Sequence, residues 1–209
     1  MKIDVIIMTC PGREAIFELT KASLKNTDWP RDREIFVSNE QGNYTDKRDR
    51  LTCNAKNALT MGLDLIKNQQ DRVLILEDDV GLNSHIHHNL QNWKPLTEEN
   101  FRFGSLYNPN VGVISINKPM NYFIANPNTC YGSQAYIFSK ACIEHCLAKW
   151  DSIEGMTDIR ITRLSAQVGP LFYHVPSLVQ HLGRESAWGG HFHYTSDYSQ
   201  QFSANPLTQ

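Results

Sequence analysis

Short apolar runs alternate with amphipathic stretches along the first 80 residues of the chain. The runs at 3–8, 34–38 and 72–76 contain β-branched residues and end at polar or turn-forming residues, so they predict three buried strands. Between them, apolar positions recur at helical spacing over 14–25 and 50–68, which predicts two amphipathic helices. This order favours a parallel sheet with right-handed crossovers, as in α/β nucleotide-binding domains.

The second half of the chain is less regular. Its pattern predicts a helix at 85–93, strands at 111–116 and 131–138, helices at 139–149 and 156–168, and a strand at 171–175. From Ser177 onward we expect loop, and from Ser196 a polar, loosely held segment. The expected fold is α/β, with a mixed, mainly parallel sheet flanked by helices in one domain over 1–195, followed by a polar C-terminal tail over 196–209.

Charge and cysteine content narrow the class of protein. The 209 residues carry a formal net charge of -2 and a pI near 6.4, so no overall positive field favours nucleic acid or anionic membranes. The five cysteines form an odd set without Cys-x-x-Cys spacing, which favours reduced thiols over a disulfide framework. No apolar run approaches the roughly 20 residues of a membrane-spanning helix. We therefore expect a cytoplasmic protein.

The third predicted strand runs directly into three carboxylates in the segment VLILEDDV, residues 73–80. In open α/β sheets, ligands bind at the carboxyl ends of the strands. Adjacent carboxylates repel one another, and oxygen ligands suit Mg²⁺ or Mn²⁺, which keep positions open for phosphate oxygens. The pattern predicts a divalent cation at this strand end, with a solvated acidic turn as the alternative.

Three segments together resemble the glycosyltransferases of the GT-A fold. VLILEDDV, after a helix containing NAKNALTMGLD (54–64), is similar to their acidic DXD metal motif. YGSQAYIFSK (131–140) is similar to the strand and helix start that follow it, and PSLVQHLG (176–183) to the final loop. The nearest likenesses are the lipopolysaccharide and procollagen galactosyltransferases and N-acetylglucosaminyltransferases with an EDD motif. The resemblance implies a Rossmann-like GT-A domain that transfers a sugar from a nucleotide-diphosphate donor, with a UDP-sugar expected.

The resemblance also implies roles for residues of the metal site. Asp79 would be the direct ligand of Mn²⁺ or Mg²⁺, and Glu77 and Asp78 would face the ribose or the sugar. His181 would reach the metal or the diphosphate from the C-terminal loop, although a lone loop histidine is otherwise usually structural. Arg184 nearby could offset diphosphate charge.

Two further strand ends are candidates for nucleotide binding. The loop TCPGR (9–13) follows the first strand, where the resemblance places base and ribose, so we expect Thr9 and Pro11 there. Arg13 could stack on the base or pair with phosphate, or it could be a solvated first-turn arginine. Ser38 and Glu40 close the second strand and are expected near the base.

An inverting transfer needs a general base for the acceptor hydroxyl. Asp158, in the segment GMTDIR (155–160), is the candidate, with Glu154 in reserve. Plain N-capping is the competing interpretation of Asp158, since aspartate caps helices well. The residues leave the choice between inversion and retention open.

Other functions share parts of this pattern. A sugar nucleotidyltransferase normally needs a glycine-rich first loop, and TCPGR has one glycine. A metal-dependent phosphodiesterase or nuclease would use acids from several strands, whereas one dense acidic cluster is visible. A non-catalytic nucleotide-sugar-binding module would keep the fold without turnover. The acceptor stays open among a glycan, a lipid-linked sugar, a protein and a hydroxylated base of phage DNA.

Overall fold

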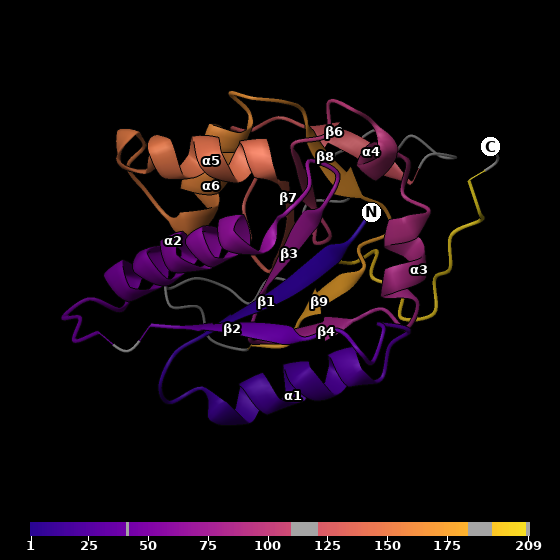
Figure 1. Cartoon of the computed structure of the whole chain (residues 1–209). Helices are drawn as coiled ribbons and strands as arrows, with labels where there is room; N and C mark the ends of the chain where they lie inside the picture. Colours follow the sequence, from indigo (N-terminus) through magenta and orange to yellow (C-terminus); the bar gives the residue numbers. More distant parts are fainter. Residues whose placement is uncertain (41, 110–120, 184–193, 208–209) are drawn as a thin grey trace.

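A central mixed sheet organises the computed structural model, which describes residues 1–40, 42–109, 121–183 and 194–207. Within these residues seven strands form one sheet in the order β2-β1-β3-β7-β5-β8-β6 (Figure 1). These strands are β1 (Ile3–Thr9), β2 (Ile35–Asn39), β3 (Arg72–Glu77), β5 (Phe103–Ser105), β6 (Tyr122–Ala125), β7 (Ala135–Ser139) and β8 (Leu171–His174). A second, two-stranded sheet pairs β4 (Val80–Leu82) with β9 (Val179–His181).

Parallel pairing dominates only one half of the large sheet. β1 lies between β2 and β3 and runs parallel to both, as the first 80 residues predict. β7 returns antiparallel to β3 and β5, β5 runs parallel to β8, and β6 runs antiparallel to β8. Among the seven described strands of this sheet, β1, β2, β3, β5 and β8 therefore share one direction, while β7 and β6 run the opposite way. This agrees with the expectation of a mixed, mainly parallel sheet. The predicted strand at 111–116 lies outside the described residues.

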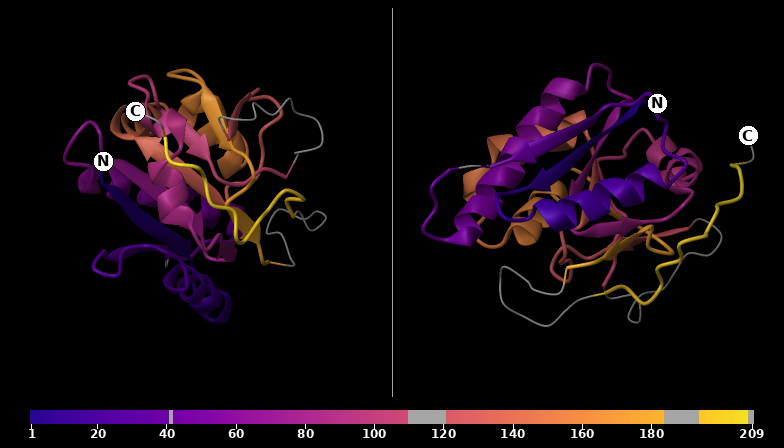
Figure 2. Two further views of the ribbon diagram at one scale, coloured as in Figure 1. Left: turned by 90° about the vertical axis from the view of Figure 1, so that its right-hand side faces the viewer. Right: turned by 90° about the horizontal axis from the view of Figure 1, so that it is seen from below.

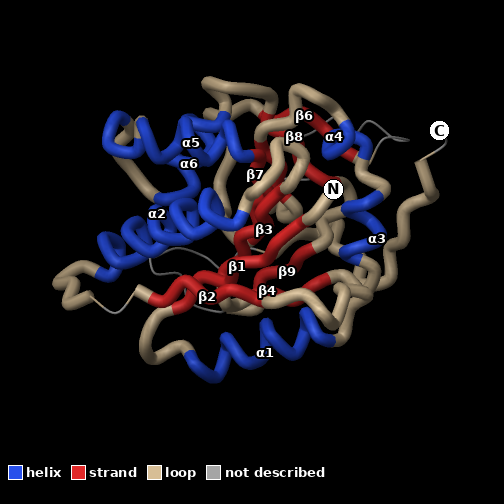
Figure 3. Tube along the Cα trace, viewed as in Figure 1, coloured by secondary structure: helices blue, strands red, loops and turns tan. Residues whose placement is uncertain are grey.

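Helices cover both faces of the sheet (Figures 2 and 3). One face carries α2 (Lys47–Leu65), α5 (Lys140–Ala148) and α6 (Thr157–Ser165), and the short 3₁₀ helix η2 (Trp150–Ser152) joins the last two. The opposite face carries α1 (Glu14–Lys25), α3 (Ile86–Gln91) and α4 (Lys94–Thr97). None of the described helices combines the length and apolarity that a membrane crossing requires.

The two central strands supply apolar side chains to both faces. In β1, Ile6 packs toward α2 while its neighbours Val5 and Ile7 pack toward α1, and all three are fully buried. In β3, Val73 faces the first layer and Leu74 the second. Successive strand side chains point to opposite faces, so a strand covered on both sides reads as a continuous apolar run. These runs explain why the central strands were predictable.

The polar C-terminal segment is attached to the domain by hydrogen bonds. Asn83 donates to the carbonyl oxygens of Ser199 at 2.7 Å and Phe202 at 3.0 Å. The Ala204 amide donates to Asn89 Oδ1 at 2.7 Å, and the Ala204 side chain is buried. The expectation of a loose segment is wrong for 196–207, because asparagine side chains distant in sequence satisfy its backbone.

All five cysteine thiols are free. Cys142 and Cys146 are fully buried in α5 and lie within 3.3 Å and 3.7 Å of the Ser165 hydroxyl. They pack between α5 and α6, as expected for buried thiols.

Candidate active site

The ends of β1 and β3 bring a hydroxyl onto the acidic cluster. The two strands are parallel and in register, with Met8 opposite Glu77. The Thr9 hydroxyl consequently donates to Asp78 Oδ2 at 2.6 Å, and both residues are buried. The ends of β1 and β3 therefore lie side by side, as predicted.

Arg13 supplies positive charge to the cluster from the loop before α1. Its Nε lies 2.9 Å from both oxygens of Asp78, and its Nη2 lies 2.6 Å from Asp79 Oδ2. The hydrogen bond with Asp78 raises the pKa of Arg13 above its ordinary value, so the guanidinium stays charged. Arg13 thus contacts both aspartates, an interaction that the sequence pattern did not predict.

β9 brings His181 to Asp79. Val80 of β4 is paired with His181, and the Leu182 amide donates to the Asp79 carbonyl oxygen at 2.7 Å. His181 Nε2 lies 3.3 Å from Asp79 Oδ2. Burial alone would raise the pKa of Asp79, but His181 and Arg13 outweigh it and hold that pKa below its ordinary value.

Gly183 closes this part of the site. A Cβ atom at Gly183 would lie 2.5 Å from Asp79 Oδ2 and 2.9 Å from His181 Nε2. Contacts that short do not occur, so a larger residue would displace the carboxylate or the imidazole. The close approach explains why a glycine follows the strand that carries His181.

The donor atoms at Asp79 fit a divalent cation that takes its other ligands from elsewhere. Asp79 Oδ1 is buried and has no hydrogen-bond partner among the described residues. A buried carboxylate oxygen is costly unless something pairs with it. Within the described ranges, however, no three His, Cys, Asp or Glu side chains group closely enough to hold a metal by themselves. Asp79 and His181 would therefore need phosphate or water oxygens to complete the coordination.

Glu77 is held by the loop that precedes β7. Ser133 Oγ donates a short hydrogen bond to Glu77 Oε1, and Gln134 Nε2 donates to Oε2 at 3.3 Å. Burial, reinforced by the negative charge of Asp79, raises the pKa of Glu77 to about 7. Glu77 is thus tied to the loop, while Asp78 and Asp79 are tied to Arg13.

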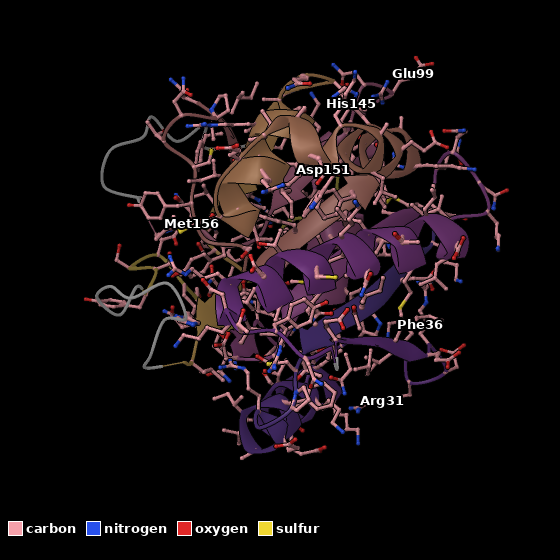
Figure 4. The ribbon with its side chains drawn as sticks, turned by 90° about the vertical axis from the view of Figure 1, so that its left-hand side faces the viewer. Arg31, Phe36, Glu99, His145, Asp151 and Met156 are labelled. Atoms are coloured by element: carbon pink, nitrogen blue, oxygen red, sulfur yellow. The ribbon has the colours of Figure 1, made fainter. Side chains whose placement is uncertain are left out.

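Asp158 contacts the same loop from the first turn of α6. Its Oδ2 accepts from the Gly132 amide and its Oδ1 from the Ile159 amide, both at 2.8 Å. The N-cap position of α6 is occupied by Met156, but Asp158 still satisfies one first-turn amide of the helix, that of Ile159. The reserve candidate Glu154 is exposed. Met156 lies at the edge of the α5 and α6 layer in Figure 4.

The side chains at the end of β2 hydrogen-bond mainly to other residues of the protein. Ser38 Oγ donates to Asn54 Oδ1 at 2.6 Å, and Asn54 Nδ2 donates to the Thr9 carbonyl oxygen at 2.8 Å. Asn54 therefore links the ends of β1 and β2 to α2. The sequence pattern did not predict this role. The one signal for it was a polar residue at a core position of the helix. Glu40 is partly exposed and accepts from Asn57 Nδ2 at 2.6 Å.

Pro11 and Arg184 are the remaining predicted donor-binding residues. Pro11 is exposed in the loop after β1. Arg184 lies outside the described residues.

A surface hollow that the sequence did not predict lies at the start of α2. Its volume is about 570 Å³, and it is lined by Tyr44, Thr45, Asp46, Lys47, Arg48 and Arg50. Asp46 caps α2 by accepting from the Arg48 amide at 2.8 Å.

Comparison with known proteins identifies the fold. No model of a protein family and no curated protein matches the sequence. A solved glycosyltransferase involved in glycosylation of the major capsid of PBCV-1 aligns with a TM-score of 0.51 and 11% identity, over 90% of this chain and 96% of its own. TarS of S. aureus aligns with a TM-score of 0.51 and 14% identity, over 83% of this chain. The chain spans only 36% of TarS. These likenesses confirm the predicted fold class: the chain has the mixed α/β fold of GT-A glycosyltransferases.

Proposed function

We propose that the protein is a metal-dependent glycosyltransferase that moves a sugar from a nucleotide-diphosphate donor, expected to be a UDP-sugar, to an acceptor hydroxyl. The observation that carries the proposal is Asp79 Oδ1 at the end of β3, which is buried beside His181 and has no hydrogen-bond partner among the described residues. Ligands of α/β sheets bind at such strand ends. The fold shared with solved glycosyltransferases supports the same class of reaction.

In this proposal Asp79 and His181 hold Mn²⁺ or Mg²⁺. When bound, the ion neutralises charge on the leaving diphosphate. Arg13, 2.6 Å from Asp79, offers a guanidinium that suits phosphate oxygens, and Arg184 would add a second. Asp78 orients Arg13 by accepting from its side chain, and the Thr9 hydroxyl in turn donates to Asp78.

The nucleotide would lie across the ends of β1 and β2. Pro11 and Glu40 are the predicted contacts that keep exposed surface there. Ser38 donates its hydroxyl to Asn54, so its contribution would be to position the strand end. Glu77, fixed by Ser133, would face the ribose or the sugar.

Asp158 would be the general base. Each of its carboxylate oxygens accepts one backbone N–H and keeps a second lone pair for the acceptor proton. In a single in-line displacement the acceptor oxygen bonds to the anomeric carbon as the bond to the diphosphate oxygen breaks. The proton passes to Asp158 and the electron pair leaves with the diphosphate, which inverts the anomeric centre.

The proposed reaction requires an acceptor with a free hydroxyl group, which several classes of molecule provide. A glycan, a lipid-linked sugar, a protein or a hydroxylated phage DNA base would each present a suitable hydroxyl. The net charge of -2 gives duplex DNA the least support, because duplex binders usually carry a basic stripe.

A thermal-shift panel tests the donor site. UDP, GDP, CDP and TDP are each added with and without Mn²⁺ to the wild type, to Asp79→Ala and to Asp64→Ala, an exposed aspartate of α2 that serves as control. We expect a stabilisation that requires one nucleotide and the metal, that persists in Asp64→Ala and that disappears in Asp79→Ala. Absence of any nucleotide response would contradict the proposal and favour a phosphodiesterase or nuclease. A response without sugar transfer to any acceptor would indicate a non-catalytic binding module.

A further inference from the structure

In the contact between Arg13 and the acidic cluster, the arginine side chain is more exposed to solvent than the two aspartates that it binds. The side chains of Asp78 and Asp79 are only 5% and 6% exposed, whereas the side chain of Arg13 is 36% exposed. Hydrogen bonds from the Thr20 hydroxyl to the Asp78 carbonyl and from the Leu182 amide to the Asp79 carbonyl fix the backbone of both acids. If the contact opens, the arginine is the group that can turn to solvent.

Arg13 neutralises charge that the protein could not otherwise bury. Two ionised carboxylates at this depth need a cation, and the guanidinium reaches both at once through Nη2, 2.7 Å from Asp78 Oδ1 and 2.6 Å from Asp79 Oδ2. His181 also neighbours Asp79, but its Nε2 lies farther from the carboxylate than the guanidinium does, at 3.3 Å. The cluster therefore carries its own counter-ion.

That counter-ion stands next to the position of the proposed metal. A divalent ion on Asp79 would lie within a few ångströms of the guanidinium on the same carboxylate. Like charges repel strongly where water is excluded. A diphosphate at the same strand end would relieve this repulsion, because it offers Arg13 other anionic oxygens.

We propose that Arg13 is a built-in counter-ion that opposes metal binding at Asp79 until a diphosphate draws its guanidinium away, so that metal and donor bind cooperatively. The inference rests on the proposed function, since it takes Asp79 as the metal ligand. It adds cooperativity to the proposed function: the metal binds weakly by itself, and the metal and the nucleotide each strengthen the binding of the other.

Binding of Mn²⁺ alone is the direct test. The electron paramagnetic resonance signal of free Mn²⁺ is followed during titration of the wild type, Arg13→Gln and Arg31→Gln, without and with UDP. A titration of UDP without protein corrects for Mn²⁺ held by the nucleotide. Arg31 is exposed on the loop before β2, so its variant loses the same charge without touching the cluster.

The expected result has two parts. Without UDP, Arg13→Gln binds Mn²⁺ about tenfold more tightly than the wild type, and Arg31→Gln binds like the wild type. With UDP, the gain in Mn²⁺ affinity is large in the wild type and small in Arg13→Gln, because the opposing charge is already gone. Binding constants, rather than turnover, report both parts.

Two other results would overturn the inference in distinguishable ways. If Arg13→Gln and the wild type bind Mn²⁺ equally without UDP while UDP still strengthens binding, the counter-ion role is wrong and the proposed function stands. If neither binds Mn²⁺ even with UDP, both are wrong. Should Arg13→Gln fail to fold by circular dichroism, the double variant Arg13→Gln/Asp78→Asn removes one charge of each sign, and the same tightening is expected of it.

Discussion

The backbone amide of Gly132 donates to the carboxylate of Asp158 at 2.8 Å, across 26 positions of sequence. The next residue, Ser133, donates to Glu77, so one short loop joins the proposed base to the acidic strand end. Gly132 has φ of 85°, a backbone conformation that favours glycine. The relative positions of Asp158 and Glu77 therefore depend on this glycine.

Gly132→Ala should destabilise the protein and reduce sugar transfer. A Cβ atom there would lie 2.7 Å from Gln134 Oε1 and 3.0 Å from Tyr107 Cε1, in addition to the cost of positive φ. We expect a loss of about 2–3 kcal/mol in the free energy of unfolding, measured in urea. Gly12→Ala is the matched control, since Gly12 has φ of 87° but open space around its Cβ position, and it should lose about 1 kcal/mol. Equal losses in the two variants would show that crowding at Gly132 is unimportant.

Gly183→Ala should separate Asp79 from His181 while leaving the fold intact. The added methyl group would overlap both side chains, whereas Gly81→Ala would meet Leu182 at an ordinary 3.4 Å. We expect the thermal shift on adding UDP with Mn²⁺ to fall by more than half in Gly183→Ala, and to persist in Gly81→Ala, because the metal ligands move only in the first. An unchanged shift in Gly183→Ala would mean that this close approach does not shape the binding site.

Asp158→Asn should abolish most transfer without affecting donor binding. Asparagine keeps the size of the side chain but accepts a proton poorly, so we expect kcat to fall by about 10²–10⁴-fold. Glu154→Gln, at the exposed reserve candidate, should leave kcat within about twofold of the wild type, since surface carboxylates that do not touch substrate contribute little. Steady-state kinetics with the donor identified by thermal shift check both expectations. Full activity in Asp158→Asn would move the general base elsewhere.

His174 should make the protein less stable in mild acid. Burial lowers the pKa of His174 to about 4, and its Nδ1 lies 2.7 Å from the Pro176 carbonyl oxygen. In the unfolded chain the pKa returns to about 6.5, so the unfolded state binds the proton first as the pH falls. Stability from this group is complete above pH 6.5 and is lost as the pH falls toward 4, by about 2 kcal/mol between pH 7 and pH 5.

Urea unfolding of the wild type and His174→Asn at both pH values isolates this contribution. Asparagine can still donate toward Pro176 but does not titrate near neutral pH. The difference in stability between the two proteins should therefore shrink by about 2 kcal/mol at pH 5. A constant difference would show that His174 is protonated alike in the folded and unfolded states.

Local patterns were sufficient for much of the framework. β1, β3, α1 and α6 lie close to their predicted positions, because a strand buried on both faces and an amphipathic helix each have their own spacing of apolar residues. The acidic cluster was visible for the same reason, since charge directly after a buried strand breaks an otherwise continuous apolar run. The fold class also followed from the order of these elements.

Long-range contacts decided the rest. Three features depend on residues that lie tens of positions apart in the sequence: the antiparallel partner of β3, the cation that reaches Asp78 and Asp79, and the loop that holds Asp158. Contacts between such distant residues leave no periodic signal along the chain. Arg13 illustrates the limit. Its sequence neighbours allow a solvated residue, a base-stacking residue or a phosphate ligand, and only the alignment of the β1 and β3 ends brings it within 2.6 Å of Asp79. Electrostatic partners are chosen by distance in space, and distance in space is a property of the folded chain.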